Sequence, residues 1–388
     1  MRVDRRARNV LTWLEQFDGW LLLSVALLAV LGLVMVYNAG SFRVASSTFY
    51  LVHHLIRLGI GFAVMVFLAG RDYRILRKPR VVGVLVIVAL AMVSMTILFR
   101  GTGLVISRAG ASRWLNLPYL PVQPVELLKV ALVLFLAQRC AGGFARLSRD
   151  RRRLLLTLAA PVAGIVLLVM QPNYGNAAVM LVITVLILFV AGLPARLLAG
   201  LSAVAVAVSV PAYFLSTKVG SRLDSWWRVL GGEAGQYQVE QSLIGLGSGG
   251  WLGAGFGAGH QRFSFLPDPH TDFIFSVVGE ELGLVGCLLM LFLFVLFAWR
   301  GYNIARSAGD DFGSLAAAGL TTMVVVYAVI NIGMVTALLP VMGLPLPFVS
   351  YGGSAMITNL AAVGILLSID RQGRELRALR ERVTRITS

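Results

Sequence analysis

The stretch FIFSVVGEELGLVGCLLMLFLFVLFAW, residues 273–299, decides the fold class of this chain. Apart from Ser276, Glu280 and Glu281 it is almost entirely apolar. A helix needs about 20 apolar residues to cross the hydrocarbon core of a bilayer. The stretch therefore predicts a transmembrane helix, and its extra length predicts a tilted one.

Nine other apolar stretches accompany it along the 388-residue chain, and several are short or interrupted by Pro and Gly. The ten predicted spans are Trp20–Tyr37, Leu55–Gly70, Val81–Phe99, Val122–Gln138, Leu154–Met170, Ala177–Gly192, Leu197–Leu215, Phe273–Trp299, Leu315–Thr336 and Phe348–Ile369. The composition agrees, since 58% of the residues are hydrophobic and 13% are charged, against about 25% charged in soluble domains. The sequence predicts an all-α polytopic integral membrane protein with ten transmembrane helices.

Basic residues fix the expected orientation and domain limits. Arg and Lys cluster before the first span, after every even-numbered span and after the last. Because such residues accumulate in cytoplasmic loops, both termini are predicted to be cytoplasmic. We expect a cytoplasmic tail over residues 1–18, one transmembrane domain over 19–370 with a large extracytoplasmic loop at 216–272, and a basic cytoplasmic tail over 371–388.

Composition and motifs exclude several function classes. The net charge of +16 is explained by the cytoplasmic loops, so no nucleic-acid partner is expected. Cys140 and Cys287 are predicted to be buried thiols rather than a disulfide or a metal site. The glycine-rich run GLGSGGWLGAGFGAG, residues 245–259, does not fit G-x-G-x-x-G and is predicted to be a flexible or closely packed loop rather than a nucleotide cradle.

Ionisable residues inside spans are costly, so they mark candidate sites. Glu126 and Lys129 are three residues apart in the fourth span, on one helix face where they can pair. One interpretation is a buried pair that neutralises itself. The other is a charged floor to an outward-facing cavity, because the pair lies near the outer end of its span.

Asp272 is the second candidate, where the large outer loop meets the eighth span. A carboxylate there could simply cap the helix N-terminus. His270, Thr271, Glu280 and Glu281 instead favour a titratable cluster around it. Asp268, between two prolines, is a weaker candidate.

Polar interruptions and outer arginines point to the same side of the membrane. The interruptions are Gln171–Asn176, Asn331 and the segment from Leu339 to Ser354, and irregular backbone at membrane depth is tolerated where it lines a cavity or is buried in protein. Arg108 and Arg113 run against the positive-inside trend. They suggest an anionic ligand such as phosphate, with contact to lipid headgroups as the alternative.

Several motifs resemble the SEDS family (shape, elongation, division and sporulation), the family of FtsW and RodA. They are GASRWL at 110–115, QPVELLK at 123–129, YQVEQSL at 237–243, LPDPHTDFIF at 266–275, GEELG at 279–283 and LPFVSYGGS at 346–354. The resemblance covers roughly residues 15–370. It implies ten transmembrane helices and a peptidoglycan polymerase that works with a class B penicillin-binding protein.

The resemblance also implies roles for individual residues. Asp272 matches the family's essential outer-loop aspartate, and Glu126 and Lys129 match its charged pair. One departure stands at Asn173, where the family usually has an aspartate in Pro-Asp-x-Gly. The full set expected to bind substrate is Glu126, Lys129, Arg113, His270, Gln123, Ser350, Gly352, Gly353, Ser354 and Asn331.

The expected reaction follows from topology and resemblance together. A site on the outer face of the bacterial cytoplasmic (inner) membrane has no nucleotide sugars or ATP, so its donor must be anchored in the bilayer, and lipid II fits. Asp272 is predicted to be the general base, with undecaprenyl pyrophosphate as leaving group. Arg113 and Lys129, or a divalent cation (Mg²⁺ or Mn²⁺), would neutralise that group. No metal ligands can be chosen, and no organic cofactor is expected.

Two other functions stay open at this point, a lipid II flippase and a non-catalytic scaffold of the cell-wall synthesis complex. Other divisome or elongasome membrane proteins are expected as partners. Gln-Ser-Leu at 241–243 and Val-Gly-Glu-Glu-Leu-Gly at 278–283 favour the division type, FtsW, whereas the Asn331 motif is as similar to RodA.

Overall fold

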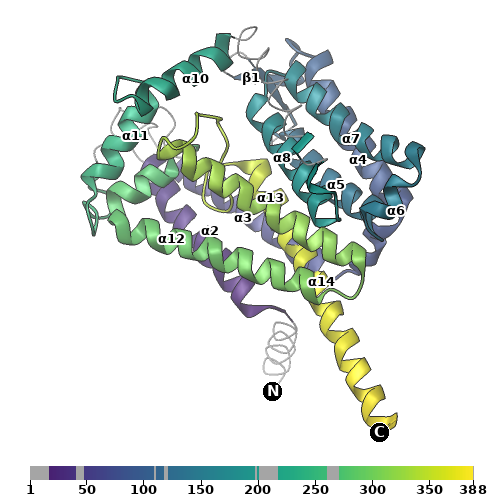
Figure 1. Ribbon diagram of the computed structural model, residues 1–388. Helices are drawn as coiled ribbons and strands as arrows, with labels where there is room; N and C mark the ends of the chain where they lie inside the picture. The colour runs from purple at the N-terminus through teal and green to yellow at the C-terminus, as the bar shows by residue number, and fades with distance from the viewer. Residues whose placement is uncertain are drawn as a thin grey trace.

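A computed structural model describes residues 17–40, 48–108, 111–117, 121–196, 199–200, 217–259 and 271–387. These residues form a helical bundle with one small hairpin (Figure 1). The helices are α2 Gly19–Gly40, α3 Thr48–Ala69, α4 Pro79–Leu98, α5 Pro124–Cys140, α6 Phe144–Ser148, α7 Arg151–Met170, α8 Tyr174–Val190, α10 Thr217–Leu230, α11 Tyr237–Ser248, α12 Ile274–Ser307, α13 Asp311–Val335 and α14 Gly353–Thr387, with a 3₁₀ helix η1 at Tyr73–Arg77.

The chain is a multi-pass membrane protein. Within the described residues, seven helices are long and apolar enough to cross a bilayer: α2, α3, α4, α7, α12, α13 and α14. Helix α8 is apolar but has 17 residues, and α5, also of 17 residues, carries Glu126 and Lys129. These nine helices coincide with nine of the ten predicted spans. The remaining one, 197–215, falls almost wholly outside the described residues.

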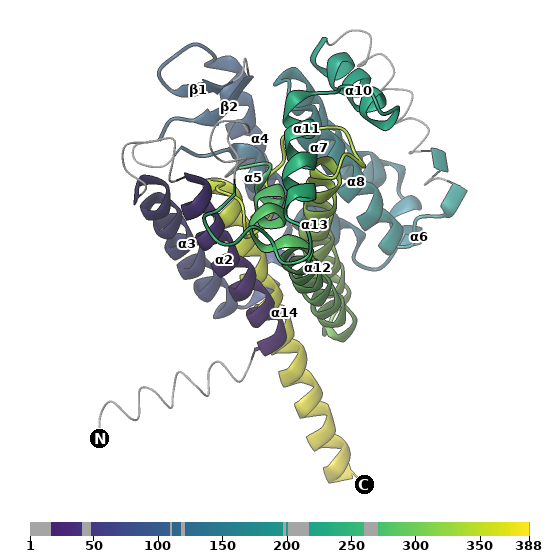
Figure 2. The same cartoon turned by 90° about the vertical axis from the view of Figure 1, so that its left-hand side faces the viewer.

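Burial separates a central helix from a peripheral one. In an apolar stretch of 18 residues within α13, 72% is buried inside the protein, against 17% in the corresponding stretch of α3. Figure 2 shows α13 in the middle of the bundle and α3 at one side. Phe62 and Phe67 of α3 are accordingly exposed, as expected for side chains that face lipid. Helix α14 packs along α3 and reaches both α12 and α13.

Helix α12 is broken rather than simply tilted, which corrects the expectation for this span. Gly283 has φ 66° and ψ −161°, a conformation that a residue with a Cβ rarely adopts. The break divides the 34 residues of α12 into a short segment up to Leu282 and a longer one after it. Only the longer segment needs to span a bilayer, so tilt is not required to explain the length.

The glycine-rich run supplies backbone hydrogen-bond partners for α12 on both sides of this break. Ala254 and Gly255 donate backbone hydrogen bonds to the carbonyls of Glu280 and Glu281, at 2.9 and 3.1 Å. On the other side of the break, Leu284 and Val285 donate to the carbonyls of Gly250 and Trp251, at 2.9 and 3.2 Å. The run is thus closely packed, one of the two forms predicted for it, although its residues 245–248 belong to helix α11 rather than to a loop.

Two expectations for the secondary structure were wrong. The chain is not purely α-helical, because β1 Val105–Arg108 and β2 Ala111–Leu115 form an antiparallel pair in the loop after α4. The last helix begins at Gly353 rather than at 348, because Phe348 has a left-handed φ of 64° that a right-handed helix does not contain. It then runs through the predicted basic tail without a break to Thr387, and Figure 2 shows it extending beyond the bundle.

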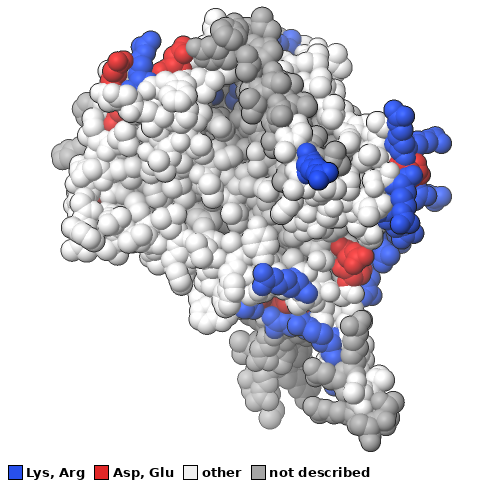
Figure 3. All heavy atoms as spheres, in the orientation of Figure 1, with Lys and Arg blue, Asp and Glu red and all other residues white. Residues whose placement is uncertain are grey.

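The predicted loop at 216–272 contains the helices α10 and α11, and both attach to the C-terminal end of α13. Trp226 of α10 donates its indole N–H to the carbonyl of Ala337 at 3.0 Å. The buried hydroxyl of Ser242 in α11 donates to the carbonyl of Val335 at 2.8 Å. Figure 3 shows Lys and Arg gathered at the other end of the bundle, beside α6 and near the place where α14 leaves the bundle. A largely uncharged surface lies between the two ends.

We expect Gly253→Ala to destabilise the protein. Gly253 has φ +80°, and an added Cβ would lie 2.1 Å from the carbonyl oxygen of Glu281. The left-handed backbone and the steric overlap together cost about 2 kcal/mol or more, so the melting temperature in detergent should fall. Gly247→Ala is the matched control, because nothing lies within 4 Å of its added Cβ. Equal melting temperatures for the two variants would contradict the described packing.

Candidate active site

Asp272 lies just before Phe273, the N-cap residue of α12. Other residues hold its segment in place through hydrogen bonds to backbone carbonyl groups. The side-chain amide of Asn331 in α13 donates to the Asp272 carbonyl at 2.8 Å and to that of Leu344 at 2.6 Å. The Ser350 hydroxyl donates to the carbonyl of Thr271 and accepts the N–H of Leu346 at 2.8 Å. Two residues predicted from the sequence, Asn331 and Ser350, therefore position the Asp272 segment.

The N-cap residue of α12 is Phe273 rather than Asp272, and the Phe273 side chain makes no capping hydrogen bond. The Asp272 carboxylate instead lies against Gly343, whose φ is +67° and whose added Cβ would be 3.4 Å from Asp272 Oδ2. A glycine at 343 thus lets the irregular segment between α13 and α14 approach the carboxylate closely.

Two arginines from separate elements interact electrostatically with Asp272: Arg113 of β2 and Arg222 of α10. Partial burial lowers the pKa of both guanidinium groups, and Asp272 acts in the opposite direction on the pKa of each. Arg222 also lowers the pKa of Arg113, because two like charges lie near each other. Both guanidinium groups stay protonated near neutral pH. Two cations beside one carboxylate favour an anionic ligand.

A β-bulge places Arg113. Ile106 pairs with Trp114 and Ser107 with Ser112, so Arg113 is the extra residue of β2. Bulges of this kind redirect a side chain out of the regular alternation. Arg113 accordingly reaches across to the carbonyl of Pro172, before α8, with one terminal nitrogen.

Two polar atoms near Asp272 are left without partners. Among the described residues, Arg113 Nε and Asn331 Oδ1 are both buried and make no hydrogen bond within the protein. Buried polar atoms are almost always satisfied by protein, water or ligand. One orphaned donor and one orphaned acceptor beside Asp272 therefore indicate a place for a polar ligand or ordered water.

The pair Glu126 and Lys129 is present, but it does not form the floor of an open cavity. Lys129 Nζ lies 2.7 Å from Glu126 Oε2, and the two side chains are 3% and 2% exposed. Lys129 Nζ also lies 3.6 Å from the ring centroid of Tyr327, a cation–π contact. Thr358 of α14 donates to Glu126 at 3.4 Å. The Lys129 ammonium is therefore occupied inside the protein, which argues against its predicted contact with the leaving group.

The pair begins a chain of buried polar side chains that crosses the bundle. Tyr327 donates to Asn176, Asn176 to Asn173, Asn173 to Gln171 and Gln171 to Thr96. The chain links six helices in the order α14, α5, α13, α8, α7 and α4 through Thr358, Glu126, Lys129, Tyr327, Asn176, Asn173, Gln171 and Thr96.

Asn173, the departure from the family pattern, has a definite place in this chain. Its amide nitrogen donates to Gln171 Oε1 at 3.2 Å and its oxygen accepts from Asn176 at 2.9 Å. An ionised aspartate accepts hydrogen bonds but cannot donate them. The asparagine therefore fits between a donor and an acceptor, where a carboxylate would face the oxygen of Gln171.

The remaining predicted residues lie around the start of α14. Ser354 accepts the backbone N–H of Gln123 at 2.8 Å, so Gln123 takes part through its main chain. Gly353 lies against Arg57 of α3, whose Nε would be 2.8 Å from an added Cβ. An added Cβ at Gly352 would be in ordinary van der Waals contact with Pro345 and Ala355. His270 lies outside the described residues.

The sequence analysis missed two arginines. Arg57 stacks on Tyr351, with its Cζ 4.6 Å from the ring centroid, and it could have been recognised as an ionisable residue within the second span. Arg222 had a weaker signal, since it is one of several charges in a long outer loop, and only the fold brings it near Asp272.

The described residues near Asp272 do not resemble a metal site. Among the described residues no group of three or more His, Cys, Asp or Glu side chains could hold a metal ion. The neighbours identified for the Asp272 carboxylate are cationic, whereas Mg²⁺ prefers oxygen ligands.

Comparison with known proteins shows which sequences and structures this chain resembles. A family model described as "Cell cycle protein", for FtsW, RodA and SpoVE, matches residues 19–375. Stage V sporulation protein E of Bacillus subtilis (strain 168) is 36% identical over 369 residues, covering 92% of this chain and 98% of that protein. A probable peptidoglycan glycosyltransferase FtsW of Geobacter metallireducens is 35% identical over 376 residues, covering 92% and 95%.

Solved structures are similar over the same length. One is described as "Structural coordination of polymerization and crosslinking by a peptidoglycan synthase complex"; it has a TM-score of 0.74, 28% identity, and coverage of 92% of this chain and 98% of that chain. The rod shape determining protein RodA of Thermus thermophilus has a TM-score of 0.67, 29% identity, and coverage of 93% and 98%.

The buried pair generates a stability prediction. Glu126→Gln keeps the size of the side chain but leaves the Lys129 ammonium buried beside a neutral amide. Breaking a buried ion pair costs about 3–5 kcal/mol in soluble proteins, so we expect a large fall in melting temperature in detergent. Lys129→Met in the same chain removes the stranded charge and should recover part of that loss. A double variant less stable than Glu126→Gln would show that the stranded charge is not the cause.

Proposed function

The chain belongs to the FtsW, RodA and SpoVE family of cell cycle proteins, and on that premise we propose that it is a peptidoglycan glycosyltransferase. It polymerises lipid II into glycan strands on the outer face of the cytoplasmic membrane. The observation that carries the proposal is the position of Asp272, held through its backbone beside two arginines from different elements. The names of the FtsW relatives support the activity.

The orientation rests on which residues meet at each end of the bundle. Asp18, before α2, pairs with Arg300 of α12 and lies 3.8 Å from Arg374 of α14. Arg77, after α3, lies 3.6 Å from Asp310, before α13. These contacts support one basic, cytoplasmic end, with Asp272 and the hairpin at the other. We assign ten spans on this basis, with the seventh at 197–215.

The reaction needs a proton acceptor and a group that neutralises the leaving pyrophosphate. Asp272 takes the proton of the 4-hydroxyl on the acceptor sugar, and the hydroxyl oxygen forms a bond to the anomeric carbon of the donor. The bond from that carbon to the pyrophosphate oxygen breaks, and undecaprenyl pyrophosphate leaves with the electron pair. One inverting displacement converts the α linkage of the donor into the β linkage of the product. General-base assistance contributes about 10²–10⁴-fold.

We assign the neutralisation of the pyrophosphate to Arg113 and Arg222. Guanidinium groups bind phosphate oxygens in a bidentate manner, and fixed cations stabilise charge that develops in the transition state. A divalent cation, Mg²⁺ or Mn²⁺, would enter bound to the pyrophosphate of the donor, because the described residues offer it no cluster of ligands.

The proposed partner is a class B penicillin-binding protein, together with other membrane proteins of the divisome or elongasome. The similarity to a peptidoglycan synthase complex that coordinates polymerisation and crosslinking supports this assignment. We propose the division type, in line with the FtsW relatives, although a sporulation protein is as similar in sequence.

A flippase that moves lipid II without chemistry is the second candidate, and the break in α12 favours it. A scaffold is the third. Purified protein with lipid II distinguishes them: glycan polymer indicates the enzyme, translocation without polymer indicates the flippase, and neither indicates the scaffold.

Asp272→Asn tests the mechanism. It keeps the size of the side chain and should leave the backbone bonds to Asn331 in place, yet it removes the base. We expect at least about a hundredfold loss of polymerisation rate, measured as glycan polymer from lipid II at matched expression and melting temperature. The control is Asp311→Asn, an exposed carboxylate at the start of α13. Near-normal polymer from a folded Asp272→Asn protein would refute the mechanism.

Cysteine labelling tests the orientation. Glu233→Cys, in the exposed turn after α10, should react with a membrane-impermeant maleimide added to intact cells freed of outer barriers. Arg149→Cys, exposed between α6 and α7, should react only after the membrane is opened. Both native thiols, Cys140 and Cys287, are buried, so the background should be low. Outside labelling at 149 would overturn the ten-span assignment.

A further inference from the structure

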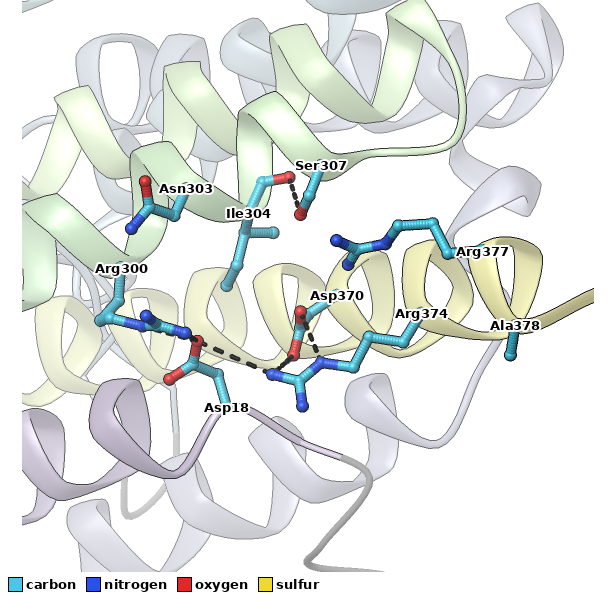
Figure 4. Close-up of a pocket in the computed structure, with 9 residues that line it drawn as sticks. All are labelled: Asp18, Arg300, Asn303, Ile304, Ser307, Asp370, Arg374, Arg377 and Ala378. Carbon is cyan, nitrogen blue, oxygen red and sulfur yellow. Dashed lines mark hydrogen bonds and ion pairs between the residues drawn. The ribbon is translucent and has the colours of Figure 1, made fainter. Parts of the chain in front are cut away.

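A cavity of about 480 Å³ opens at the basic end of the bundle, at the opposite end of α12 from Asp272. Its walls come from the C-terminal part of α12, the middle of α14 and the residue before α2 (Figure 4). Asp18, Arg300, Asp370, Arg374 and Arg377 provide its charged groups, and Asn303 and Ser307 add neutral polar ones.

The carboxylates of this cavity are engaged by two of its arginines. Asp18, with a side chain 1% exposed, accepts the Nε of Arg300 at 2.8 Å. Arg374 contacts Asp370 through Nε at 3.0 Å and through a terminal nitrogen at 2.9 Å. Figure 4 shows these pairs joined through Asp18 and Arg374.

Arg377 provides the third guanidinium group of the cavity, and its hydrogen bond is to a backbone carbonyl rather than to a carboxylate. Its Nε donates to the carbonyl of Gly373 at 3.3 Å, within its own helix. Arg377 and Ser307 also line a neighbouring cavity of about 380 Å³, whose wall includes Arg306. Four arginines therefore surround two adjoining cavities that contain two carboxylates.

The surface next to the cavity is apolar and exposed. Val295 and Trp299 are 64% and 56% exposed, and they precede Asn303 at intervals of four residues on one face of α12. The Arg300 guanidinium lies 5.1 Å from the Trp299 ring centroid. Tryptophans with nearby cations are typical of the membrane–water interface, so a lipid chain could lie along this face with its headgroup over the cavity.

We propose that this cavity binds a phosphate group, supplied by the headgroup of an anionic lipid. Guanidinium forks match phosphate oxygens, and basic pockets between transmembrane helices at the cytoplasmic side bind anionic headgroups. The acyl chains lie along the face of Val295 and Trp299. The site is independent of the Asp272 chemistry, and it joins α2, α12 and α14 through one ligand.

The test uses the full chain purified in detergent, with phosphatidylglycerol, phosphatidylcholine or inorganic phosphate added. Arg377→Gln removes one positive charge and leaves the hydrogen bonds from Arg300 to Asp18 and from Arg374 to Asp370 in place. The matched control is Arg382→Gln, which removes the same charge from an exposed position of the same helix outside the cavity. Binding is measured by native mass spectrometry and by the rise in melting temperature.

We expect phosphatidylglycerol to bind and stabilise the wild type more than phosphatidylcholine does. Arg377→Gln should weaken that binding by about tenfold, whereas Arg382→Gln should change it by less than about twofold. Equal losses in both variants would overturn the site in favour of diffuse attraction. Stabilisation by inorganic phosphate but not by the lipid would overturn the lipid assignment, and no preference among the three additions would overturn the proposal entirely.

Discussion

The architecture depends on one constraint, that backbone polar groups within a bilayer must find partners inside the protein. The break at Gly283 frees peptide groups in the N-terminal part of α12, and the glycine-rich run supplies partners on both sides of it. This arrangement lets a span stop and restart, so that a short helical segment can follow Asp272 directly. The run needs glycine there because its backbone lies against that of α12, and a Cβ at Gly249 would be 1.9 Å from the carbonyl oxygen of Gly279.

Charged groups inside the bundle likewise need partners within the protein. The buried pair of Glu126 and Lys129 is compensated locally and continues into a chain of neutral amides and hydroxyls. The pair can therefore fix the mutual positions of several helices without exposing a net charge to lipid. The groups near Asp272 behave differently, because two guanidinium groups act on one identified carboxylate and, among the described residues, Arg113 Nε and Asn331 Oδ1 make no hydrogen bond. The first arrangement is complete, while the second leaves capacity for a ligand.

Much of this could be predicted from the sequence, and the failures have physical reasons. Hydropathy located the spans because a lipid environment demands long apolar helices, and the cost of buried charge identified Glu126, Lys129 and Asp272. Asn331 and Ser350 were correctly placed near Asp272, but their role is to hold its backbone. Arg222 was missed because the docking of α10 on α13 is a tertiary event. The interruption at Gly283 was interpreted as tilt, since hydropathy averages over a single glycine, and the bulge at Arg113 depends on a pairing register that one strand alone does not reveal.

Helix α14 joins the two ends of the molecule through an unbroken ladder of peptide hydrogen bonds. Its 35 residues correspond to about 50 Å of helix. One terminus lies beside Ser350 and Arg57, and the other extends past the ion pairs of Asp18. A straight helix of this length bends little and compresses less. A displacement or rotation of the C-terminal end of α14 would therefore be transmitted along the helix to Gly352 and Gly353 at its N-terminal end.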